Sequence, residues 1–65
     1  MSLINAKKLT ENEIKIQEEK KANYTHIIET TTDEYERKNA IFMLDNTEKF
    51  LSELYELKET LSTLD

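Results

Sequence analysis

The second half of this chain carries apolar residues at alternating spacings of three and four, in a 65-residue sequence with neither glycine nor proline. This spacing places the side chains on one stripe of an α-helix and does not fit a strand, whose side chains alternate with a period of two. The stripe comprises Ala40, Met43, Thr47, Phe50, Leu54, Leu57, Leu61 and Leu64. A second row beside it comprises Ile41, Leu44, Leu51 and Tyr55. An apolar face this broad predicts that the protein folds and works through contacts between helices.

An earlier helix is expected to begin at Thr10, because the run from Thr10 to Glu13 has the pattern of a capping box. We expect this helix over about residues 10–30, preceded by residues 1–9 as either a flexible segment or a helical extension. Its apolar residues are sparse in the middle, where residues 17–21 are all polar or charged. The apolar residues of this helix are Ile14, Ile16, Ala22, Tyr24, Ile27 and Ile28.

Three consecutive threonines, Thr30 to Thr32, predict the break between the helices. β-Branched hydroxyl residues are poor in a helix interior, since their side chains compete for backbone hydrogen bonds. Thr31 and Glu34 have the spacing of a second capping box, which predicts a turn at about 30–33 and a helix over about 33–64. A further cap signal at Asp45-Asn46-Thr47 leaves open a break there, which would give three helices.

The expected architecture is an all-α helical hairpin, a single domain over residues 10–65. The longer second helix would overhang the first and leave Leu57, Leu61 and Leu64 uncovered. Each Leu-sized side chain left exposed forgoes about 1.5–3 kcal/mol. We therefore expect dimerisation into a four-helix bundle, with a three-helix monomer as the alternative and the parallel or antiparallel arrangement left open. The residues predicted to carry self-association are Phe50, Leu54, Leu57, Leu61 and Leu64.

Catalytic chemistry has little support in this composition. There is no cysteine, so no disulfide, thiolate metal ligand or cysteine nucleophile, and no glycine-bearing loop to cradle a phosphate. The single histidine, His26, forms a His-x-x-Glu pair with Glu29, the reverse of the Glu-x-x-His order of bundle metal sites, and the apolar stripes contain no Glu to complete a site. We expect no enzyme activity, no cofactor and no metal.

Charge is distributed unevenly, and the net charge is −5. Residues 1–31 carry five Lys and five Glu, whereas residues 32–65 carry four basic and nine acidic residues. An acidic surface repels phosphate backbones, so direct nucleic-acid binding is not expected. Neither a signal peptide nor a membrane-spanning stretch is visible, which predicts a cytoplasmic protein. Abundant Lys, Glu, Asn and Ile favour a low-GC bacterium or one of its phages, in which case the location is the host cytoplasm.

These features together predict a small acidic interaction protein, a homodimer that regulates or inhibits another protein by docking onto it. The candidate partner surface comprises Phe42, Tyr55, Glu48, Glu56 and Glu59. One alternative is an acidic mimic of nucleic acid that blocks a DNA- or RNA-binding protein. Its charges would be Asp33, Glu36, Asp45, Glu48, Glu53, Glu56, Glu59 and Asp65. A second alternative is a structural coiled-coil component of a larger assembly.

Overall fold

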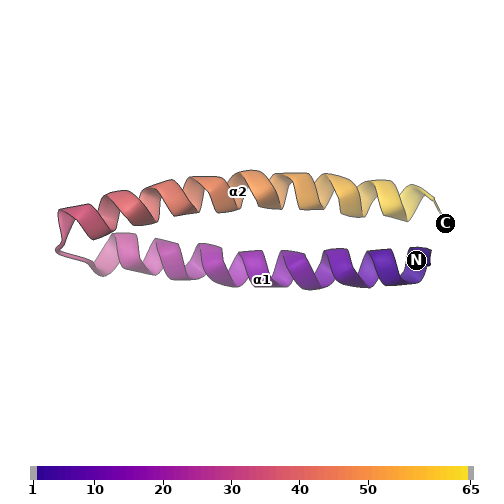
Figure 1. Cartoon of the computed structure of the whole chain (residues 1–65), viewed down its shortest axis with the longest axis horizontal. Coiled ribbons are helices and arrows are strands. Elements are labelled where there is room, and N and C mark those ends of the chain that lie inside the picture. Colours follow the sequence, from indigo (N-terminus) through magenta and orange to yellow (C-terminus); the bar gives the residue numbers. More distant parts are fainter. Residues whose placement is uncertain (1, 65) are drawn as a thin grey trace.

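The computed structural model describes residues 2–64, which form two α-helices joined by a short turn. Helix α1 spans Leu3–Thr30 and helix α2 spans Glu34–Thr63. The helices lie antiparallel over nearly their whole length, in a body that measures 48 × 16 × 14 Å (Figure 1). The predicted all-α helical hairpin is confirmed, and the second helix agrees with its expected bounds to within one residue.

The start of the first helix was wrongly predicted. Helix α1 begins at Leu3, where the Ser2 hydroxyl caps it by accepting a hydrogen bond from the backbone N–H of Asn5 at 3.2 Å. The Thr10 hydroxyl instead donates to the carbonyl of Ala6 at 2.8 Å, inside the helix, and the residue is buried. Residues 3–9 therefore form the helical extension, and Thr10 supplies no cap.

This longer first helix changes the expected shape of the hairpin. Helices α1 and α2 contain 28 and 30 residues, so α2 does not overhang its partner. The premise that Leu57, Leu61 and Leu64 extend beyond α1 is wrong. The alternative of a third helix is wrong as well, because α2 continues through Thr47 and Asp45 pairs with Lys49 at 3.0 Å.

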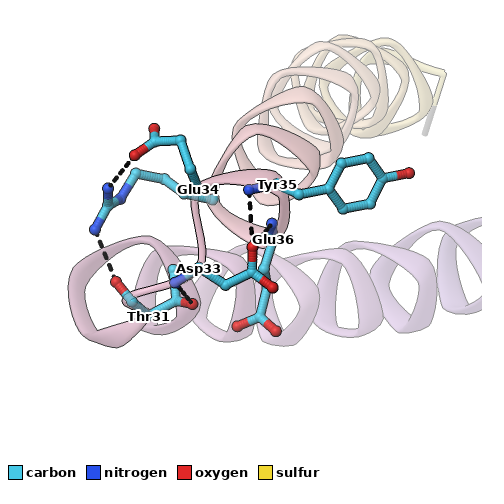
Figure 2. Close-up of polar contacts among 6 residues, drawn as sticks. Thr31, Asp33, Glu34, Tyr35 and Glu36 are labelled. Carbon is cyan, nitrogen blue, oxygen red and sulfur yellow. Dashed lines mark hydrogen bonds and ion pairs between the residues drawn. The ribbon is translucent and has the colours of Figure 1, made fainter.

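The turn is built from hydroxyl and carboxylate caps in place of glycine (Figure 2). The Thr31 hydroxyl accepts from the N–H of Asp33 at 3.1 Å, and Asp33 accepts from the N–H groups of Tyr35 at 2.9 Å and Glu36 at 3.4 Å. Asp33 is therefore the N-cap of α2, and the expected Thr31–Glu34 capping box is wrong. Arg37 closes the turn by donating to the Thr31 carbonyl at 2.7 Å.

Replacing Asp33 with alanine should destabilise the protein by about 1 kcal/mol, within the range of about 0.5–2 kcal/mol typical of lost N-caps. Two backbone N–H groups at the start of α2 would lose their acceptor. The measurement is urea unfolding followed by circular dichroism. Thr32→Ala, an exposed neighbour in the same turn, is the control and should change the unfolding midpoint little. Equal losses in the two variants would contradict the capping role.

The core between the helices is small. Ile14 of α1 packs with Leu51 and Leu54 of α2, and Ala40 is the remaining buried apolar residue among those described. Thr10, Gln17 and Thr47 are also buried, so polar residues alternate with apolar ones along this interface. No large side chain in residues 2–64 is completely buried. A core of this size gives the hairpin little stability of its own.

Helix α2 packs against α1 along a line that takes residues from both predicted rows. The residues buried against α1 are Ala40, Thr47, Leu51 and Leu54, drawn from both rows. Met43, Phe50 and Leu57 flank this line on one side, while Ile41 and Tyr55 flank it on the other. Three of the residues buried against α1 thus belong to the first row, and Leu51 belongs to the second.

Candidate functional site

The two broad faces of the hairpin carry different side chains. On one of them, Met43, Phe50, Leu57 and Leu64 follow one another at seven-residue spacing along α2. Phe50 is 40% exposed, Leu57 46% and Leu64 63%, so these side chains remain largely in water. We call this side the apolar face.

Helix α1 contributes to the same face. Lys20 and Tyr24 of α1 line a shallow groove together with Met43 and Phe50 of α2, which places Lys20 on the apolar face. Ile16 stands one helical turn before Lys20, and Leu9 stands seven residues before Ile16, so both continue this side of α1. Both are exposed. Sequence reasoning missed them as surface residues, although their seven-residue spacing was visible.

The residues predicted for self-association divide between this face and the core. Phe50, Leu57 and Leu64 lie on the apolar face and are exposed. Leu54 is only 7% exposed and packs against Ile14 within the same chain. Leu61 is half-buried near the end of α2. The prediction of self-association therefore depends on Phe50, Leu57 and Leu64.

The opposite face carries more charge. A groove there is lined by Glu18 and Lys21 of α1 and by Glu48, Ser52 and Tyr55 of α2, above the buried Leu51. The Tyr55 hydroxyl donates a hydrogen bond to the Glu18 carboxylate at 2.5 Å, which joins the two helices. This bond is the main reason that the pKa of Tyr55 is raised above its ordinary value of 10.0. Partial loss of hydration and the negative charge of Glu18 act in the same direction.

Replacing Glu18 with glutamine should lower the pKa of Tyr55 toward its ordinary value, because an amide acceptor is weaker and carries no charge. The measurement is a spectrophotometric titration of the tyrosine absorbance in the two proteins. A raised folded-state pKa means that the bond stabilises the fold below about pH 10 and is lost as the pH rises through that pKa. Glu19→Gln, on an exposed neighbour, is the control. An unchanged titration in Glu18→Gln would contradict the pairing.

The residues of the candidate partner surface do not form one site. Glu48 and Tyr55 line the groove on the charged face, whereas Glu56 and Glu59 line a separate shallow groove with Thr60 and Thr63. Phe42 is 63% exposed on α2, and its Cα stands roughly 20 Å along the helix from Tyr55 at 1.5 Å per residue.

The acidic side chains proposed for nucleic-acid mimicry are also spread around α2. Asp33 caps the helix, Asp45 is paired with Lys49, and Glu48 and Glu56 line different grooves. Asp65 lies outside the described residues. Two of these carboxylates therefore already have partners within the hairpin, at the N-cap and in the Asp45–Lys49 pair.

Within residues 2–64, no three His, Asp or Glu side chains are grouped so as to hold a metal ion. His26 and Glu29 line a shallow open groove with Glu18, Lys21, Ala22 and Thr25. No helix in this part of the chain is both long and apolar enough to cross a membrane.

Comparison with protein-family models, with curated proteins and with solved structures found no match to this chain.

Proposed function

We propose that this chain is a small helical interaction protein without catalytic activity, which self-associates through its apolar face and in that form regulates or inhibits another protein. The observation that carries the proposal is the exposure of Phe50, Leu57 and Leu64 along one face. Contiguous apolar surface rimmed by polar residues is typical of protein–protein contact sites.

The small core supports the same proposal. Four buried apolar residues hold the two helices together, while a comparable number of larger ones remain exposed on the apolar face. Burial of each such side chain contributes about 1.5–3 kcal/mol. Covering the apolar face therefore adds a stabilisation that the isolated hairpin lacks.

The size of the face suits a second copy of the chain. A body 48 Å long and 16 Å wide offers one long side on the order of 800 Å². That is close to the area that each partner buries in a stable protein–protein interface of standard size. In such a dimer, the charged face and the exposed back of α2 around Phe42 stay free for the regulated protein.

The test is the solution mass by light scattering over a wide concentration range, with helicity followed by circular dichroism in the same samples. We expect a strongly helical dimer whose mass changes little with ionic strength, because apolar association is only weakly screened by salt. A helical monomer at every concentration would contradict the proposal. Open-ended growth in mass would instead support the structural coiled-coil alternative.

A further inference from the structure

On α1, the apolar face contains two charged residues, Glu13 and Lys20. They stand three residues before and four residues after Ile16, on the same side of the helix. Glu13 is half-buried and accepts a hydrogen bond from the Gln17 amide at 2.8 Å, while Lys20 lines the groove beside Phe50. Neither residue makes an ion pair within the described part of the chain.

A second copy covering this face removes water from both charges. Removing water from a charged group costs free energy unless the charge is paired. The two charges therefore favour one orientation of the second copy over the other. A two-fold axis parallel to the helices places α1 over the partner's α2, whose row of Met43, Phe50, Leu57 and Leu64 brings no basic residue to Glu13. A two-fold axis across the helices places α1 over the partner's α1, running in the opposite direction.

The crossing axis pairs the charges when it passes between residues 16 and 17, midway between Glu13 and Lys20. Lys20 then lies opposite the partner's Glu13, and Glu13 lies opposite the partner's Lys20. The same midpoint relates Ala6 to Ile27, which belong to the same side of α1 at seven-residue spacing. Small and large apolar residues therefore also meet across this axis.

The same axis also matches the apolar row of α2. Residues 17–24 of α1 and 43–50 of the antiparallel α2 line one groove, so Gln17 and Phe50 stand at the same end of it. An axis at this height sets Phe50 against the partner's Phe50. Met43 and Leu57 stand seven residues before and after Phe50. Met43 of one copy therefore lies opposite Leu57 of the other copy. One axis thus satisfies the charges of α1 and the apolar row of α2.

We propose that a second, antiparallel copy covers the apolar face, with Phe50 at the centre and Glu13–Lys20 ion pairs between the copies. This arrangement rests on the proposed function and adds to it the orientation and the register of the dimer. It makes Glu13 and Lys20 the residues that determine specificity, since the parallel orientation brings no basic residue to Glu13.

Charge reversal tests the pairing. Glu13→Lys and Lys20→Glu should each weaken dimerisation about tenfold or more, because each sets like charges against one another twice per dimer. The double variant Glu13→Lys/Lys20→Glu should recover most of the lost affinity. The control is Lys15→Glu, which changes the net charge by the same amount as Lys20→Glu at an exposed position off the apolar face. It should leave the dissociation constant of the dimer unchanged. Dimer dissociation constants from sedimentation and helicity from circular dichroism are the measurements.

Distances between spin labels test the orientation independently. The chain has no cysteine, so a label on Met43→Cys, Phe50→Cys or Leu57→Cys occupies a single position. The antiparallel dimer predicts the shortest separation at position 50. At positions 43 and 57 the two labels are offset by fourteen residues, roughly 20 Å along the helix.

The outcomes separate this arrangement from the proposed function. Equal label separations at the three positions, or a double charge reversal as weak as the single ones, would overturn the antiparallel register while leaving a dimer. A monomer in every wild-type sample would overturn both the register and the proposed self-association.

Discussion

Truncating Leu51 or Leu54 to alanine is expected to abolish most of the helical structure at 25 °C. These two leucines and Ile14 form the cluster that joins α2 to α1. Removing a buried leucine side chain costs about 2–5 kcal/mol, because the lost contacts add to the cavity left behind. A core in a chain of fewer than about 70 residues rarely supplies more than about 3–5 kcal/mol in total. A single truncation therefore removes most of the stability that the core of the hairpin supplies.

The measurement is urea unfolding by circular dichroism, extrapolated to zero denaturant, at one protein concentration for all variants. Phe42→Ala serves as the control, because Phe42 is a large apolar residue on the same helix that is exposed in the structure. Its loss should change the free energy of unfolding by no more than about 0.5 kcal/mol. Comparable losses for Leu51→Ala and Phe42→Ala would show that the helices pack along a different line.

The second large effect is expected from Leu57→Asp, which should convert the proposed dimer to a monomer and reduce its helicity. Leu57 lies on the apolar face, and an aspartate there would be buried without a partner when a second copy covers it. Leaving a buried charge unpaired costs several kcal/mol, on the order of 3–5 kcal/mol, which exceeds the gain from burying one leucine. Because the monomeric hairpin has a small core, dissociation should lower its thermal stability too.

Light scattering and thermal unfolding measure this outcome. Phe42→Asp introduces the same charge on α2 away from the apolar face, and it should leave the mass of the protein unchanged. If Leu57→Asp keeps both its mass and its helicity, the apolar face is not the interface.

The second helix and the turn were predictable because their signals are local. The heptad spacing identifies α2 from the helical period alone. Three consecutive threonines predict a turn because their hydroxyls compete for backbone hydrogen bonds. The start of α1 was not predictable in the same way. Ser2 and Thr10 both have hydroxyls that can cap a helix, but Ser2 is the cap, and Thr10 is buried within α1 and bonded to the Ala6 carbonyl.

The line of contact between the helices was hidden for a related reason. The apolar rows on α2 are wide enough to pack against α1 along more than one line. The sequence of α1 does not mark its buried side clearly, because two of the residues buried there, Thr10 and Gln17, are polar. Only packing of both helices decides that Leu51 points inward while Phe50 and Leu57 stay on the surface. The candidate site was therefore predicted in its residue types but not in its division between core and surface.

The single turn closed by Arg37 and Thr31 has a consequence for the order of folding. Every contact between α1 and α2 is nested around this turn, so pairs near it close short loops and pairs near the chain ends close long ones (Figure 1). The entropic cost of closing a loop grows with its length. We therefore expect the contacts between the helices to form from the turn outward and to break first at the opposite end. Leu57 and Leu64 lie toward that fraying end. Contacts made there act on the part of the hairpin that orders last, so a partner bound at that end slows unfolding more than it speeds folding.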